Sequence, residues 1–135
     1  MIVSLFNVFG IAGSGMSAQS VRLNLTASNL ANAQSVATRP EDAYRARHPV
    51  FQSILDGASS TGVRTAGIVH SDAKSEARYA PGHPLADESG YVHTSNVNTM
   101  EEMANMISAS RSFQQNVEVM NTSKELLLRT LRLGE

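Results

Sequence analysis

The fold is decided by the last quarter of the chain, residues 99–133, which read TMEEMANMISASRSFQQNVEVMNTSKELLLRTLRL. Positions spaced alternately three and four residues apart share one face of a helix. In this stretch they are Met103, Met106, Ser110, Phe113, Val117, Met120, Lys124, Leu127 and Leu131. Seven of these nine residues are apolar, so the spacing predicts one long helix with an apolar seam.

Both ends of this predicted helix carry boundary signals. Thr99 can cap the amino terminus, and Glu102 can reach back to complete a capping box. Arg129 and Arg132 suit the negative end of the helix dipole, and Gly134 can end the helix. The helix is therefore expected to run from about residue 99 almost to the last residue.

The long helix is apolar on more than one face. Further large apolar residues lie off the seam at Ile107, Val119, Leu126, Leu128 and Leu133. Such a helix is either buried in an assembly or prone to aggregate. The sequence favours burial against other chains, while a helical hairpin within one chain is the simpler alternative for the seam.

A second helix is predicted near the amino terminus, over about residues 10–33. It has a broad apolar face with small residues between the large ones, and residues 1–38 carry only one charged side chain, Arg22. It would be about ten residues shorter than its partner. Asn29 and Asn32 lie three apart at its end, and we expect both amides to bond backbone groups, either of the chain's own turn toward Pro40 or of a neighbouring subunit. The alternative is two solvated surface amides.

The middle of the chain lacks helical periodicity. Residues 39–98 hold all four prolines and five of the nine glycines. Short strands are expected at 44–51, 63–70 and 91–93, with a flexible turn at 58–62. The predicted fold is mainly α with a small β part. Two long terminal helices pair as a coiled-coil-like hairpin around a short β-rich or irregular middle, with segments at 1–38, 39–98 and 99–135.

Composition argues against several functions. The net charge is −1, so no basic surface is expected to bind nucleic acid. There is no cysteine, which excludes disulfides and zinc–thiolate sites. The first eleven residues are too short to span a membrane, and no basic residue precedes them as in a signal peptide. We therefore expect no membrane span and no cleaved signal.

No motif indicates an enzyme. The glycine-rich segment 10–15 lacks the strand and lysine of a phosphate-binding loop, so it is interpreted as a flexible helix start. The four histidines lie at 48, 70, 83 and 93, without metal-ligand or catalytic-triad spacing. No catalytic, cofactor or metal site is predicted.

Three segments in order resemble a known family. Residues 18–32, AQSVRLNLTASNLAN, resemble the amino-terminal signature of bacterial flagellar rod and hook proteins. Residues 79–98, with YAPGHPLAD, GYV and SNVN, are similar to that family's pre-helix motif, although proline is common where Ser95 stands. Residues 102–134 resemble its carboxy-terminal signature. The chain length and short middle are similar to those of proximal rod proteins.

This resemblance implies a structural role. Such proteins assemble through their terminal helices into the rod, the drive shaft that transmits torque and surrounds the export channel. The implied partners are other rod proteins and copies of the same chain, near the inner-membrane ring and export apparatus. The implied location is the periplasmic rod of the basal body, reached by type III export without cleavage.

From the stripes and this resemblance together, twelve residues are predicted at subunit interfaces. They are Val21, Leu25, Asn29, Leu30, Asn32, Met103, Met106, Phe113, Val117, Met120, Leu127 and Leu131. A cytoplasmic coiled-coil adaptor is the alternative function. It would explain the seam but not the nearly uncharged first 38 residues or the middle motif.

Overall fold

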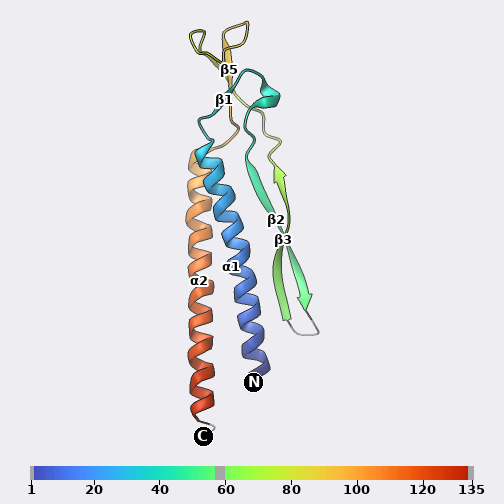
Figure 1. Cartoon of the computed structure of the whole chain (residues 1–135), viewed down its shortest axis with the longest axis vertical. Helices are drawn as coiled ribbons and strands as arrows, with labels where there is room; N and C mark the ends of the chain where they lie inside the picture. Colours follow the sequence, from blue (N-terminus) through green and yellow to red (C-terminus); the bar gives the residue numbers. More distant parts are fainter. Residues whose placement is uncertain (1, 57–59, 134–135) are drawn as a thin grey trace.

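The structure is a computed structural model that describes residues 2–56 and 60–133. Two long helices, α1 (Ile2–Ala31) and α2 (Thr99–Arg132), run antiparallel and side by side (Figure 1). A β-hairpin lies along α1, and a small sheet lies beyond one end of the helix pair. The start of α1 and the end of α2 lie at the opposite end.

Helix α1 begins eight residues earlier than the sequence predicted. It contains 30 residues against 34 in α2, so the expected ten-residue difference is wrong. Gly13 and Gly15 lie in the helix interior rather than in its first turn. Packing against neighbouring elements offsets the weak helix propensity of glycine there, because tertiary contacts supply most helix stability in proteins.

Helix α2 has the predicted span, but its cap differs from the predicted one. The side chain of Asn98, not Thr99, accepts hydrogen bonds from the backbone amides of Met100 and Glu101 at 3.1 and 3.2 Å. Glu102 does not reach back and is buried instead. The expected end at Gly134 lies outside the described residues.

The first two predicted strands are longer than expected and form one antiparallel hairpin. Strand β2 spans Arg47–Asp56 and β3 spans Ser60–His70. A bulge between Val50 and Phe51 breaks the register. The predicted turn at 58–62 is therefore partly wrong, because residues 60–62 belong to β3; residues 57–59 lie outside the described part.

The third predicted strand belongs to a separate sheet. Strand β5 (Tyr91–Thr94) lies between β1 (Val36–Ala37) and β4 (Ala77–Tyr79), and both pairings are antiparallel. A one-turn 3-10 helix, Pro40–Asp42, follows β1. This sheet joins the end of α1 to the start of α2, because β1 follows the first helix and β5 precedes the second (Figure 1).

Helix α1 is the middle of three layers. It packs against α2 on one side and against β2 and β3 on the other (Figure 1). The buried apolar residues of the described chain are Ala12, Ala18, Leu25, Ala43, Ala46, Val92 and Ala109. Most of them are alanine. Small residues let backbones approach closely but remove little apolar surface from water, so the single chain has a thin core.

Candidate assembly interface

Residues 13–15 of α1 are contacted from two sides. The hydroxyl of Ser14 accepts a hydrogen bond from the backbone N–H of Val63 in β3 at 3.1 Å. On the other side, a methyl group added at Gly15 would lie 2.9 Å from Nδ2 of Asn116 in α2. The expectation of a flexible helix start at 10–15 is thus wrong, because these small residues let α1 fit between two neighbours.

A second polar contact region surrounds Asn29, whose side chain is completely buried. Its Oδ1 accepts from the hydroxyl of Tyr44 and the backbone N–H of Arg47, both at 2.9 Å. Its Nδ2 donates to the carbonyl of Arg47 at 2.9 Å and to Oε2 of Glu102 at 3.1 Å. The amide therefore uses its full hydrogen-bonding capacity within the chain.

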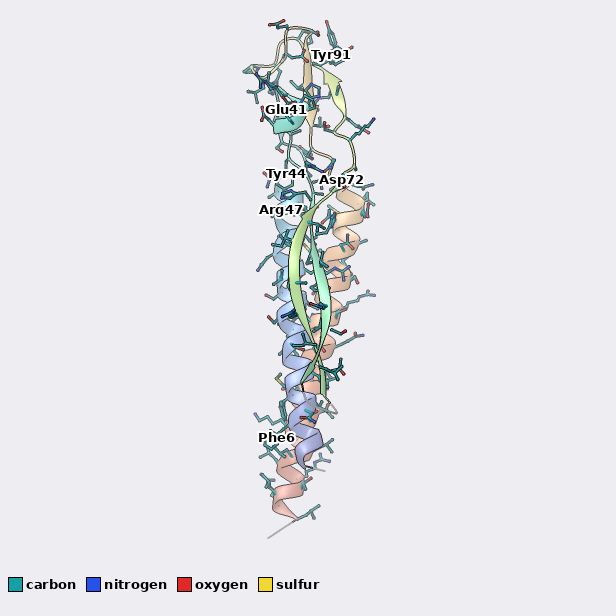
Figure 2. The ribbon with its side chains drawn as sticks, turned by 90° about the vertical axis from the view of Figure 1, so that its right-hand side faces the viewer. Phe6, Glu41, Tyr44, Arg47, Asp72 and Tyr91 are labelled. Carbon is teal, nitrogen blue, oxygen red and sulfur yellow. The ribbon has the colours of Figure 1, made fainter. Side chains whose placement is uncertain are left out.

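The Arg47 side chain closes this region at the base of the hairpin. Its Nη2 donates to the hydroxyl of Ser28 at 2.7 Å, and its guanidinium carbon lies 5.7 Å from the centre of the Tyr44 ring. Figure 2 shows Tyr44 and Arg47 together, where the hairpin leaves the smaller sheet. The hairpin is therefore held to α1 near both of its ends.

The prediction for the two asparagines is confirmed in that both amides bond backbone groups, but neither partner lies in the turn toward Pro40. Asn29 bonds the backbone of Arg47, and Asn32 donates from Nδ2 to the carbonyl of Ser28 at 2.8 Å. Both backbone partners belong to this chain. The alternative of two solvated amides is wrong, since Asn29 is buried and Asn32 is half-buried.

The face of α2 that meets α1 is rotated from the predicted seam. Asn29 contacts Glu102, Gly15 faces Asn116, and Ala109 and Ser123 are buried. Helical spacing then places these positions toward α1: Glu102, Met106, Ala109, Phe113, Asn116, Met120, Ser123 and Leu127. On this face Glu102, Ala109, Asn116 and Ser123, which are polar or small, take the places of Met103, Ser110, Val117 and Lys124 in the predicted seam.

The twelve predicted interface residues fall into three groups. Leu25 and Asn29 are buried within the chain. Half-buried are Val21, Leu30, Asn32, Met106, Phe113, Val117, Met120 and Leu127. Met103 and Leu131 are exposed, at 49% and 56%. The described chain thus uses part of this set for its own fold.

Large apolar side chains remain exposed on two flanks of α2. The first flank has a seven-residue spacing and consists of Val119, Leu126 and Leu133, which are 46%, 48% and 88% exposed. The second consists of Met103, Leu128 and Leu131, which are 49%, 45% and 56% exposed. Helical geometry places them on opposite sides of the face that meets α1. We call these groups the first and second apolar flanks.

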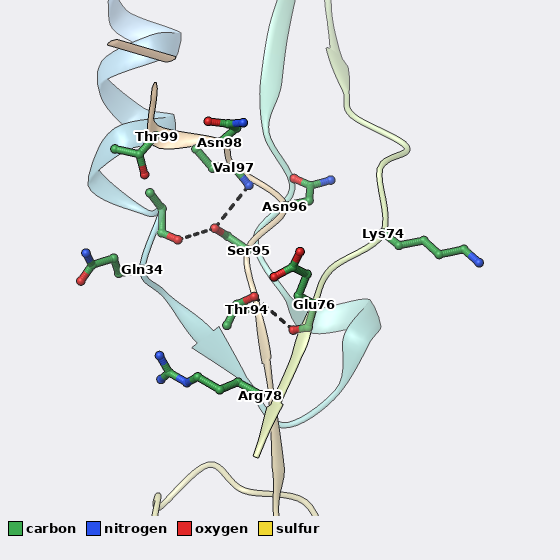
Figure 3. Close-up of a pocket in the computed structure, with 11 residues that line it drawn as sticks. Gln34, Lys74, Glu76, Arg78, Thr94, Ser95, Asn96, Val97, Asn98 and Thr99 are labelled. Carbon is green, nitrogen blue, oxygen red and sulfur yellow. Dashed lines mark hydrogen bonds between the residues drawn. The ribbon is translucent and has the colours of Figure 1, made fainter. Parts of the chain in front are cut away.

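A polar cleft of about 700 Å³ lies where the turn after α1, β4, β5 and the start of α2 meet (Figure 3). The Ser95 hydroxyl donates to the carbonyl of Ala33 at 2.6 Å, and the Thr94 hydroxyl donates to the carbonyl of Glu76 at 3.1 Å. These bonds hold β5 to its neighbours. Within residues 2–56 and 60–133, no cluster of three potential metal ligands occurs, and no helix has the length and apolarity of a membrane span.

Sequence reasoning missed the polar residues that hold the layers together. These are Ser14, Tyr44, Arg47, Glu102 and Asn116. A seven-residue spacing was available as a signal, since Gly15, Arg22 and Asn29 recur on α1 at this interval. Apolar periodicity does not reveal this series, because none of its members is a large apolar residue.

Comparisons with known proteins agree with this architecture. Residues 9–36 match the family described as Flagella basal body rod protein, and residues 88–133 match Flagellar basal body rod FlgEFG protein C-terminal. Similar proteins include the flagellar basal-body rod proteins FlgC of Escherichia coli O6:H1, Yersinia enterocolitica and Salmonella typhimurium. They are 51%, 52% and 49% identical to the chain, over 98% of this chain and 100% of each relative.

Such identity over full length, together with two family matches at the two helices, decides the assignment. These relatives are named as rod proteins, a structural class, which excludes the enzyme and adaptor interpretations. The chain therefore belongs to the FlgC family of flagellar basal-body rod proteins.

Proposed function

We propose that this chain is a structural rod subunit that assembles laterally through the two apolar flanks of α2. In the rod, these flanks lie against helices of neighbouring subunits, which are copies of this chain or other rod proteins. The segments 1–38 and 99–135 act as one assembly unit, and the middle segment 39–98 extends from it. The location is the periplasmic rod, reached without cleavage of a signal.

One observation carries this proposal: α2 keeps large apolar residues on both flanks after α1 has covered its inner face. Leu128, Leu131 and Leu133 are each at least 45% exposed. Contiguous exposed apolar surface on a soluble chain marks an interaction site. Two flanks on opposite sides give each helix two neighbours, as a closed or helical array requires.

The pairing of α1 with α2 resembles a coiled coil in its spacing. On α2 the inner positions alternate by four and three residues from Glu102 to Leu127. Glu102, Ala109, Asn116 and Ser123 form one seven-residue series, and Met106, Phe113, Met120 and Leu127 form the other. This pattern supports knobs-into-holes packing of the helix pair. Each pair then forms one lengthwise element of the rod wall.

A rod built from such helix pairs transmits torque through the lateral contacts between neighbouring subunits. Shear between neighbouring subunits is spread along the length of each helix, so no single contact carries the load. The predicted interface set divides accordingly. Met103 and Leu131 belong to the lateral contacts, whereas Leu25 and Asn29 hold the subunit's own layers together.

The test is a charge placed on an apolar flank. Leu128→Asp should leave the subunit folded and exported, because Leu128 is 45% exposed in the single chain. It should abolish rod assembly, because burying an unpaired carboxylate between subunits costs several kcal/mol, roughly. Glu118→Lys is the control, since Glu118 is an exposed residue of the same helix on the side away from α1 and from both flanks.

Both variants are expressed in a strain that lacks the chain, and secretion, swimming and purified basal bodies are compared. We expect Glu118→Lys to restore swimming and Leu128→Asp to be secreted without forming rods. Swimming by Leu128→Asp would show that this flank is not buried in the assembly. Absence of the wild-type chain from basal bodies would contradict the rod function itself.

A further inference from the structure

We propose that Asn29 is a positioning residue that couples two docking events, pairing of α1 with α2 and attachment of the β2–β3 hairpin. The two events take place on opposite sides of α1. Among the described residues, Asn29 is the one whose side chain bonds both α2, at Glu102, and β2, at Arg47. The inference concerns the folded single chain and goes beyond the proposed rod function.

The coupling arises because a carboxamide has two different ends. Arg47 presents a backbone N–H to the oxygen of Asn29 and a carbonyl to its nitrogen, which fixes the orientation of the amide. Glu102 is an acceptor and also requires the nitrogen end. Each neighbour therefore selects the amide orientation that the other one needs.

Burial makes this mutual selection energetically important. Asn29 is 0% exposed and Glu102 is 3% exposed, so water does not replace a lost partner while the helices are paired. A flipped amide would set N–H against N–H at Arg47 and oxygen against oxygen at Glu102. In a buried network, each satisfied bond thus strengthens the next, which is an energetic coupling between the two sides of α1.

The chain provides a matched control contact. Arg22 donates from Nη2 to Oδ1 of Asn105 at 3.0 Å, which is a second polar bond between α1 and α2. This bond involves neither Asn29 nor the hairpin. If Asn29 carries the coupling, loss of the Arg22–Asn105 bond weakens helix pairing without loosening the base of the hairpin.

The hairpin also provides an internal reference. The backbone N–H of Arg47 reports on the attachment at Asn29, whereas the N–H of Val63 reports on the attachment at Ser14. The two attachment points on α1 are 15 residues apart. A general loss of stability accelerates hydrogen exchange at both amides, while a coupling through Asn29 acts mainly on Arg47.

The experiment is residue-resolved amide hydrogen exchange by NMR on the full-length chain. Glu102→Leu should accelerate exchange at Arg47 by about fivefold or more, because the substitution leaves the buried Nδ2 of Asn29 without its acceptor in α2. Val63 should change much less. Glu102→Gln, which keeps an acceptor oxygen, and Asn105→Ala should both leave Arg47 near its wild-type rate.

Three results would overturn the proposal. They are an unchanged Arg47 rate in Glu102→Leu, equal acceleration at Arg47 and Val63, and an Asn105→Ala effect as large as that of Glu102→Leu. If Glu102→Leu does not fold, the same comparisons apply to Glu102→Asp, whose carboxylate is one methylene shorter. Acceleration at Arg47 in that variant, with Val63 unchanged, supports the coupling.

Discussion

Gly15 shows how the absence of a side chain fixes the distance between two helices. Its backbone meets the side chain of Asn116, whose Nδ2 is held by the carbonyl of Ser112 at 2.9 Å. The neighbour therefore has little freedom to move away. At Gly10, in the same helix, an added methyl group would meet no heavy atom within 4 Å apart from the adjoining residues and backbone of α1 itself.

This contrast gives a matched pair of substitutions. Gly15→Val should lower the free energy of unfolding by about 1–3 kcal/mol, the usual range for overpacking a tight contact. Gly10→Val should change it by no more than about 0.5 kcal/mol, because valine fits open space and has a better helix propensity than glycine. Urea unfolding followed by circular dichroism measures both values.

A second substitution checks the cause of the Gly15 effect. Asn116→Ala removes the side chain that an added Cβ would meet, so it should restore part of the stability lost in Gly15→Val. Equal losses at Gly10 and Gly15 would show instead that α1 does not approach α2 closely at this position.

Asp87 gives the smaller sheet a dependence on pH. Its Oδ1 accepts hydrogen bonds from the backbone amides of Tyr91 and Ser89, both at 2.9 Å. The bond from Tyr91 is the main reason that the pKa of Asp87 lies below its ordinary value of 3.8. The bond from Ser89 and the nearby His93 also lower this pKa, whereas desolvation opposes them.

The direction of the pH effect follows from this lowered pKa. The carboxylate stabilises the turn fully above pH 3.8, and this contribution is lost as the pH falls through the lower pKa of the folded state. Exchange of the Ser89 and Tyr91 amides should therefore accelerate in acid, beyond the intrinsic change, in the wild-type chain. In Asp87→Asn this additional acid-dependent step should be missing. An identical pH profile in both proteins would contradict the assignment.

At the scale of elements, the hairpin is held along α1 by a small number of polar bonds. Ser14→Ala removes the acceptor of the Val63 amide. We expect exchange at Val63 to accelerate by about fivefold, which corresponds to roughly 1 kcal/mol for one neutral hydrogen bond. Ser17→Ala, an exposed position of the same helix, is the control and should leave Val63 unchanged.

The sequence predicted the two helices because each has an apolar stripe with helical period. It also predicted strands close to β2, β3 and β5 from short β-prone runs between glycine and proline. It did not predict that they belong to two sheets, because β1 has only two residues and β4 only three. Runs this short carry no periodicity, and their pairing depends on contacts distant in the sequence.

The inner face of α2 was misplaced for a physical reason. Apolar spacing favoured Met103 and Val117, yet the close contacts are made by Glu102 and Asn116. A prediction from apolar spacing assumes that the buried face of a helix is its most hydrophobic face. In this chain the closest helix approach uses small and polar residues, and the displaced apolar side chains form flanks that the chain itself leaves open.

For the whole molecule, the thin core and open flanks predict self-association. With a net charge of −1, little electrostatic repulsion keeps copies apart. Sodium sulfate should strengthen association in sedimentation velocity, because it favours burial of apolar surface. Leu128→Asp combined with Leu131→Asp should reduce association at equal protein concentration. Dissociation by added sodium chloride would indicate that ion pairs, not apolar flanks, join the copies.

The hairpin is attached to α1 at two points, so the length of helix between these points must equal the length of strand between their partners. Ser14 and Asn29 are 15 residues apart, about 22 Å of helix. Their hairpin partners are Val63 and Arg47, and Arg47 pairs with His70, so the same interval spans seven residues of β3, about 23 Å.

Insertions between these points would therefore be tolerated only in fixed steps. One added residue in α1 turns everything before it by about 100°, so that Ser14 no longer faces the hairpin. Five helical turns restore the phase of the helices over about 18 residues, and about eight residues in each strand match this length while keeping the two-residue alternation of the strand faces. A longer version of this subunit would gain about fifty residues together, at four places in the chain, whereas single-residue changes of length belong in the loops.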